Sequence, residues 1–183
     1  MDKPEFRVFI VLGSETDDKI LIESKMTDML DAVGLYWEVW IASSHRHLRE
    51  LTEAINLNKR TSQAAKSIFV SAASMSAALP GVMEAILEGG WPVIGIALPS
   101  PEFPNAMDAL LSMVRMPGRM PVMCAGIGKS GFVNAATIAC QLVAFADSDF
   151  VGVLERNQRD ASEEKPAKIP LRISTRVIPG GGE

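Results

Sequence analysis

The sequence contains few cysteines, no long apolar run and no excess of basic residues. Its 183 residues include two cysteines, Cys124 and Cys140, too few for a disulfide framework and typical of buried thiols in a reducing cytosol. No stretch approaches the roughly 20 apolar residues of a membrane span, and the polar first residues do not resemble a signal peptide. The formal net charge of −4 disfavours a general nucleic-acid binder, which needs a basic face. We therefore expect a soluble, cytoplasmic protein that binds neither a membrane nor nucleic acid.

The apolar residues that are present alternate between strand-like and helix-like patterns. Short apolar and β-branched runs predict strands over residues 6–12, 37–42, 67–72, 91–98 and 121–125. Helical spacing follows each of them, over residues 18–33, a segment ending near 58, and residues 79–88, 106–115 and 131–146. This alternation predicts an α/β domain with a parallel sheet covered by helices on both faces. We place that domain at residues 1–150 and interpret the charged, Pro- and Gly-containing residues 151–183 as a C-terminal extension or tail.

In such sheets ligands bind beyond the carboxyl ends of the strands, so the strand-to-helix loops are the candidate sites. These are residues 13–17, 43–47, 73–81, 99–105 and 126–131. In the first loop, the Ser14 hydroxyl is a candidate donor to a phosphate, and Asp17 is a candidate acceptor from a ribose hydroxyl. The alternative is that Thr16 or Asp17 merely caps the following helix.

The second loop holds both histidines of the chain. Arg46 suits bidentate phosphate binding, and Ser43 and Ser44 can add hydroxyl donors. His45 is a candidate proton carrier because imidazole titrates near neutrality. Alternatively, a histidine caps the helix start and Arg46 pairs with a carboxylate. Metal binding by His45 and His47 is weakly supported, since no third ligand lies nearby in the sequence. We expect no metal and no organic cofactor.

The third and fifth loops are rich in small residues. Residues 73–81 allow a ligand ring to approach the backbone, with Ser74, Ser76 and Leu79 as candidate substrate contacts. A tight loop packed against a neighbour is an equally good interpretation. Residues 126–131, with glycines, a lysine and a following helix, resemble a second phosphate cradle but lack the spacing of either nucleotide fingerprint.

Taken in order, these loops resemble the phosphoribosylaminoimidazole carboxylase family, known as PurE. The family has Gly-Ser-x-Ser-Asp in its first loop and Ser-Ala-His-Arg in its second, close to residues 13–17 and 43–46 here. The later matching segments are residues 78–83, 108–117 and 126–131. The match runs from about Val8 to Ala146, and its five motifs in register make it specific.

The resemblance implies a three-layer, flavodoxin-like domain that assembles as a homo-octamer. It implies a carboxylated aminoimidazole ribonucleotide and carbon dioxide as the small-molecule partners, in purine biosynthesis. It further implies that Ser14, Asp17, Ser43 and Arg46 hold the ribose phosphate and that His45 carries the proton.

The third loop departs from both branches of that family. The mutase branch has Gly-Gly and then His-Leu-Pro-Gly, where this chain has Ser74-Met75 and then Ala78-Leu79-Pro80-Gly81. The direct carboxylase branch has Arg-Ser-Asn in this loop, of which only the serine is present. The expected activity is therefore that of a carboxyaminoimidazole ribonucleotide mutase or a direct carboxylase. The alternatives are a relative acting on another phosphorylated heterocycle and a non-catalytic nucleotide-binding relative.

Overall fold

The computed structural model describes residues 6–61 and 66–156, which form a five-stranded parallel sheet with the order β2-β1-β3-β4-β5. The strands are β1 (Phe6–Leu12), β2 (Tyr36–Ile41), β3 (Lys66–Ala73), β4 (Val93–Ala97) and β5 (Met123–Ile127). Every pairing is parallel. β1 lies between β2 and β3, and its Phe9 is paired with Glu38 of β2 and with Phe69 of β3. Each predicted strand is present, with ends that differ by a few residues.

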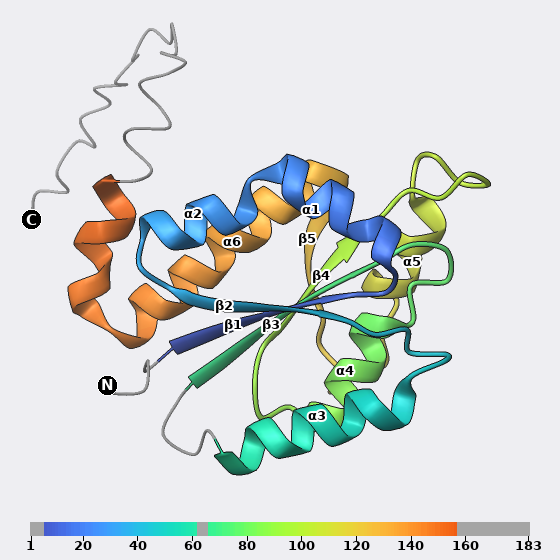
Figure 1. Ribbon diagram of the computed structural model, residues 1–183, viewed down its shortest axis with the longest axis horizontal. Helices are drawn as coiled ribbons and strands as arrows, with labels where there is room; N and C mark the ends of the chain where they lie inside the picture. Colours follow the sequence, from blue (N-terminus) through green and yellow to red (C-terminus); the bar gives the residue numbers. More distant parts are fainter. Residues whose placement is uncertain (1–5, 62–65, 157–183) are drawn as a thin grey trace, which may run out of the picture.

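Helices cover both faces of this sheet, as Figure 1 shows. One face carries α1 (Asp18–Ser24), α2 (Met26–Ala32) and α6 (Gly128–Ala146). The other carries α3 (Leu48–Thr61), α4 (Leu79–Leu87) and α5 (Met107–Val114). The predicted three-layer, flavodoxin-like α/β arrangement is therefore confirmed. In the described residues, no helix combines the length and apolar character that crossing a membrane requires.

Two cores form because successive strand residues point to opposite faces. On β1, Val8 and Ile10 enter the core under α1, α2 and α6, whereas Phe9 enters the core under α3, α4 and α5. The second core contains an aromatic stack in which the Phe9 and Phe69 ring centroids lie 5.1 Å apart and those of Phe69 and Trp91 5.9 Å apart. Each fully buried side chain of this size contributes about 1.5–3 kcal/mol, so the sheet is anchored from both sides.

The prediction of a single helix over residues 18–33 is wrong, because the helix is interrupted at Lys25. Lys25 has a left-handed φ of 59°, which ends α1 and begins α2. The Ser24 hydroxyl donates to the Leu21 carbonyl (2.6 Å) and accepts the Met26 N–H (3.2 Å), replacing helical backbone bonds at the break. Gly34, with φ 74°, ends the second helix as expected.

The prediction that residues 126–131 form a loop is also wrong. β5 continues to Ile127 and α6 begins at Gly128, so these residues form a strand end and a first helical turn. Gly131 lies against the sheet, where an added Cβ would meet Ile96 Cγ2 at 2.7 Å. The small residues here allow close packing between helix and strand.

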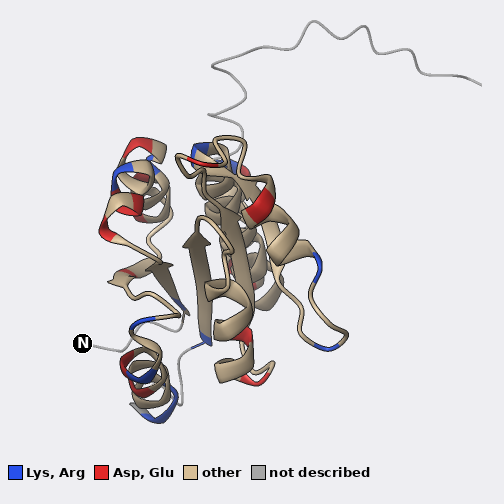
Figure 2. Cartoon of the chain, turned by 90° about the vertical axis from the view of Figure 1, so that its right-hand side faces the viewer, with Lys and Arg blue, Asp and Glu red and all other residues tan. Residues whose placement is uncertain are grey.

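The connection between α5 and β5, residues 115–122, projects from the body of the domain (Figure 2) and is called the arm below. At the other end of the described chain, residues 151–156 are helical, and Val153 and Leu154 pack against the core under α6. The rest of the predicted tail, residues 157–183, lies outside the described residues. The domain boundary at residue 150 therefore stays a prediction.

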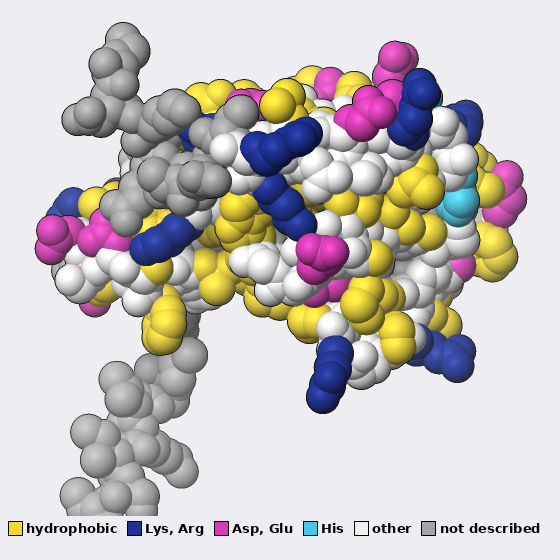
Figure 3. Space-filling model, turned by 90° about the horizontal axis from the view of Figure 1, so that it is seen from below, with side chains coloured by type: hydrophobic (Ala, Val, Ile, Leu, Met, Phe, Trp, Pro, Cys, Tyr) yellow, Lys and Arg dark blue, Asp and Glu magenta, His cyan; other side chains and the backbone are white. Residues whose placement is uncertain are grey.

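The face formed by α3 and α4 shows hydrophobic side chains interspersed with charged ones (Figure 3). Exposed apolar side chains lie on α3, where Leu57 is 57% exposed, and on α5, where Val114 is 55% exposed. A histidine side chain appears at one edge of this view (Figure 3).

Candidate functional site

The parallel strands bring four strand-to-helix loops to one edge of the sheet. Backbone hydrogen bonds join the strand ends directly: the Ala42 N–H donates to the Leu12 carbonyl (2.9 Å), and the Gly13 N–H donates to the Ala72 carbonyl (3.0 Å). Each loop therefore begins within hydrogen-bonding distance of its neighbour's strand, which fixes the distances among the side chains that follow.

A pocket of about 710 Å³ lies among these loops. The predicted site residues Ser14, Asp17, Ser43, His45, Arg46, Ser74, Ser76 and Leu79 all line it. Its other lining residues are Gly13, Thr16, Ile20, Ser44, Ala73, Met75, Ala77, Ala78, Pro99, Ser100 and Pro101. Residues from four different loops thus share one cavity, although their individual roles remain predictions.

The first loop is closed by a buried carboxylate. Asp17 is 5% exposed, and its Oδ2 accepts the Ser14 N–H at 3.0 Å. The Ser14 and Thr16 hydroxyl oxygens lie 2.7 Å apart and share a hydrogen bond. Burial raises the pKa of Asp17, while hydrogen bonds from Ser14 and Gly13 oppose that rise. Asp17 therefore stabilises the turn, as the capping alternative expected, and also borders the pocket.

The two histidines of the second loop have different surroundings. His47 Nδ1 accepts the Ser43 N–H at 3.2 Å, which requires the tautomer protonated at Nε2. The Arg46 and His47 N–H groups donate to the Ser43 carbonyl at 3.2 and 2.8 Å. His47 therefore holds the loop, whereas the exposed His45 lines the pocket. Within residues 6–61 and 66–156, no group of three or more His, Cys, Asp or Glu side chains is placed to hold a metal ion.

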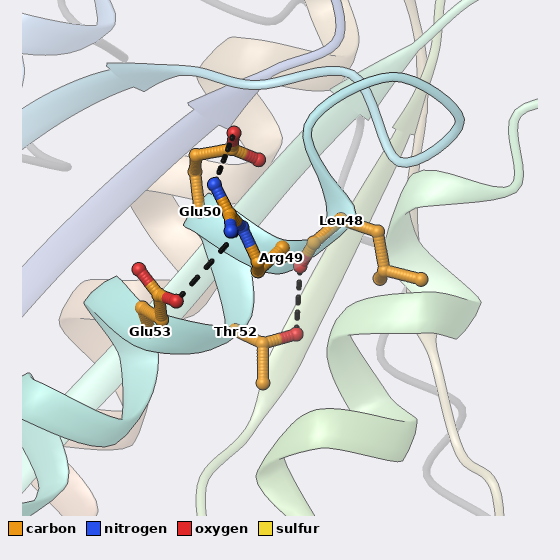
Figure 4. Close-up of polar contacts among 5 residues, drawn as sticks. All are labelled: Leu48, Arg49, Glu50, Thr52 and Glu53. Carbon is orange, nitrogen blue, oxygen red and sulfur yellow. Dashed lines mark hydrogen bonds and ion pairs between the residues drawn. The ribbon is translucent and has the colours of Figure 1, made fainter.

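The two arginines near this loop have different surroundings. Arg49 forms exposed ion pairs with Glu50 (3.9 Å) and Glu53 (4.0 Å), as Figure 4 shows. The Thr52 hydroxyl donates to the Leu48 carbonyl at 2.7 Å in the same turn. Arg49 thus has its ion-pair partners on the helix surface, whereas Arg46 lines the pocket.

The third loop has an unusual backbone. Met75 and Ala77 have φ values of 58° and 40°, in the left-handed region that residues with a Cβ rarely adopt. The Ala77 N–H donates to the Ser74 carbonyl at 3.0 Å, which closes the turn. Met75 is 58% exposed at the pocket, whereas Leu79, the first residue of α4, is almost fully buried.

The fourth loop contributes a residue that the sequence interpretation did not select. Ser100 is 7% exposed, its hydroxyl accepts the Phe103 N–H at 3.1 Å, and its N–H donates to the Phe103 carbonyl at 3.2 Å. Thr16, considered only as a helix cap, also lines the pocket, as does Ser44, which was a candidate hydroxyl donor. Their loops were candidates, but nothing in the residue types indicated which hydroxyls would face inward.

Residues 126–131 do not line this pocket, contrary to the expected second phosphate cradle. Lys129, in the first turn of α6, instead pairs with Glu23 of α1 at 2.5 Å. The hydrogen bond and charge of Lys129 lower the pKa of Glu23. The lysine therefore joins two helices on the face of the sheet that α1 and α6 cover.

Comparisons with known proteins agree with this architecture. The profile of the family described as AIR carboxylase matches residues 7–164. The chain is 31% identical over 156 residues to N5-carboxyaminoimidazole ribonucleotide mutase of Bacillus subtilis (strain 168), covering 85% of this chain and 91% of that one. It is 36% identical over 142 residues to the Methanocaldococcus jannaschii protein of the same name, covering 78% and 82%. The crystal structure of Treponema denticola PurE aligns with a TM-score of 0.72 at 20% identity, over 87% of this chain and 93% of that one, which supports the fold.

Proposed function

Because the chain belongs to the AIR carboxylase family, we propose that it is an enzyme of purine biosynthesis that interconverts carboxylated aminoimidazole ribonucleotides. The reaction is that of an N5-carboxyaminoimidazole ribonucleotide mutase or of a direct aminoimidazole ribonucleotide carboxylase. The observation that carries the proposal is the shared pocket, in which His45 and Arg46 lie with Ser14 and Asp17 from a different loop. An anionic nucleotide would there meet a cation, several hydroxyls and an imidazole.

We assign substrate binding mainly to the first two loops. Arg46 would hold the ribose phosphate through charge-assisted hydrogen bonds, supported by the hydroxyls of Ser14 and Ser43. Asp17 would accept from a ribose hydroxyl with the lone pairs that the Ser14 N–H leaves free. The third loop, with Ser74, Ser76 and Leu79, would cover the imidazole ring. His47 would act only by keeping Ser43 in place.

Proton transfer falls to His45. In the mutase route the carbamate C–N bond breaks, its electron pair returns to the amine nitrogen, and protonated His45 gives that nitrogen a proton as carbon dioxide is released. The ring carbon then attacks carbon dioxide, and His45 removes the proton that this carbon carried. The direct route consists of the second step alone. Neither step transfers electrons to a redox partner, so no redox cofactor enters the proposal.

We further propose that the protein is cytoplasmic and acts as a homo-octamer. The chain exposes apolar side chains that subunit contacts would cover, among them Met107 (43%), Leu111 (46%) and Val114 (55%) along α5 and Phe145 (94%) on α6. Sedimentation analysis tests the assembly directly.

The enzymatic proposal is tested with His45→Asn, assayed with the N-carboxylated substrate and separately with aminoimidazole ribonucleotide plus bicarbonate. We expect turnover to fall by at least about 100-fold, the range attributed to general acid–base catalysis, with nearly unchanged nucleotide binding. Full activity in this variant would remove His45 from its proposed role.

Arg46→Ala tests phosphate binding in the same protein, and Arg49→Ala is its matched control because Arg49 is paired with Glu50 and Glu53. We expect Arg46→Ala to weaken the ribonucleotide about 10- to 150-fold, from roughly 1.5–3 kcal/mol for a charge-assisted hydrogen bond, and to change nucleoside binding far less. Equal weakening of nucleotide and nucleoside would place the phosphate elsewhere.

A second candidate function has a specific basis in the third loop. Met75 projects at the pocket and Ala78 offers no polar group there, so the ring-binding part of the cavity is more apolar than the resemblance implies. A different phosphorylated heterocycle would fit such a surface. Absence of turnover with both substrates, together with retained phosphate binding at Arg46, would favour this function or a non-catalytic role.

A further inference from the structure

A second cavity, of about 540 Å³, lies at the opposite end of the sheet from the nucleotide pocket and shares no residue with it. Its walls come from the end of α4, from the segment leading into β4, and from the arm before β5. Two side chains of opposite charge border the cavity, Glu84 from α4 and Arg119 from the arm. Trp91 also lines it. The proposed enzymatic function assigns no role to either charge.

Glu84 is the acidic partner, and its surroundings are unfavourable for a lone carboxylate. The residue is 2% exposed, and its Oε1 has no hydrogen-bond partner among the described residues. Burial raises the pKa of this carboxyl, because the charged form loses its hydration. Such a carboxyl either takes up a proton or needs a cation or hydrogen-bond donors to compensate its charge.

Arg119 is the basic partner, and its backbone is unfavourable for any residue with a Cβ. Its φ is 68°, a left-handed conformation that glycine adopts without steric cost. The side chain is exposed at the cavity, and no ion pair of Arg119 occurs within the part of the chain that the structure describes. A strained backbone of this kind persists where other interactions compensate for it.

We propose that Arg119 forms an ion pair with Glu84 that fastens the arm to α4. The guanidinium enters the cavity, supplies the missing partner of Glu84 Oε1, and compensates for the strain at its own backbone. Both groups border the same cavity, so the pair would bridge that cavity between α4 and the arm. The proposal is independent of the chemistry at His45.

The ion pair would also support the nucleotide pocket. Met116 of the arm packs on Gly81 in the first turn of α4, where an added Cβ would lie 2.9 Å from Met116 Cε. That turn begins with Leu79, a residue that lines the nucleotide pocket. Fastening the arm at Arg119 therefore holds the turn that carries Leu79.

The proposal is tested by Arg119→Gly, with Lys25→Gly as the matched control. Lys25 is also an exposed cation in the left-handed region, with φ 59°. If neither side chain contributed, glycine would change the melting temperature similarly at both positions, by relief of backbone strain. We expect Lys25→Gly to leave the melting temperature unchanged or to raise it. We expect Arg119→Gly to lower the melting temperature by several degrees. In a Glu84→Gln background, the two glycine substitutions should have the same effect. Equal effects of the two substitutions in the wild-type background would overturn the proposal.

Limited trypsin digestion gives a readout that does not depend on Arg119 variants. The arm contains two cleavable bonds, Arg115–Met116 and Arg119–Met120. If Glu84 binds Arg119, Glu84→Gln should accelerate cleavage after Arg119 more than cleavage after Arg115. Equal acceleration at both bonds would mean general loosening of the arm and would count against the ion pair.

Discussion

The left-handed backbone at Met75 in the third loop leads to a quantitative prediction. At φ 58° the Cβ crowds the carbonyl oxygen, which costs about 1–2 kcal/mol for a residue other than glycine. Met75→Gly removes that cost, but it also removes the contacts that the exposed side chain makes at the pocket. The informative comparison is therefore between Met75→Gly and Met75→Ala, because both variants lose every side-chain atom beyond Cβ.

The expected difference follows from two opposing effects. Glycine gains the relief of about 1–2 kcal/mol and loses about 0.4–1 kcal/mol because it makes the unfolded chain more disordered. Met75→Gly should therefore unfold with a free energy about 1 kcal/mol higher than Met75→Ala. For a chain of this size, that difference corresponds to roughly 2–4 °C in melting temperature.

Urea and thermal denaturation of the two variants measure this difference, and the neighbouring Ser76 supplies the control. Ser76 is exposed and is not among the described residues with positive φ, so Ser76→Gly should be less stable than Ser76→Ala by about 0.4–1 kcal/mol. The sign of the glycine-minus-alanine difference should thus reverse between positions 75 and 76. If alanine is the more stable residue at both, the backbone at Met75 carries no strain and the reasoning fails.

Three further predictions concern other parts of the fold. Gly131→Ala should lower the free energy of unfolding by about 1–3 kcal/mol in urea titration. The reason is that the added Cβ would lie 2.7 Å from Ile96 Cγ2 and 3.0 Å from the Gly126 carbonyl. An unchanged urea midpoint would contradict this prediction. Since Lys129 lowers the pKa of Glu23 from its ordinary 4.5, the pair stabilises the fold above pH 4.5 and loses that effect as pH falls below it. Glu23→Gln should therefore be less stable than the wild type at pH 7 and nearly equal to it at pH 3, and a constant difference at both pH values would exclude the pair as its source. Burial raises the pKa of Cys140 to about 11, so a thiol reagent at pH 8 should modify it only after denaturation; rapid labelling of Cys140 in the native protein would refute its burial.

Local sequence pattern predicted most of the elements, because each depends on short-range periodicity. The apolar run of β1, residues 6–12, and the helical spacing of α5 needed no knowledge of their neighbours. The rule that ligands bind at the carboxyl ends of parallel strands then located the four loops of the pocket, since it depends only on strand direction. Every predicted site residue lies in that pocket, and their chemical roles remain predictions.

Long-range packing decided the features that these rules missed. The break at Lys25 and the close contact of Gly131 with Ile96 depend on where α1, α2 and α6 meet the sheet. Likewise, Glu84 is a charged residue that a local pattern would place in solvent, yet α4 buries it beside the arm. Residue type and spacing therefore determined which elements form and which loops can bind a ligand. The three-dimensional packing alone decided which polar groups are buried and which lie together, because these properties arise from contacts between residues distant in the chain.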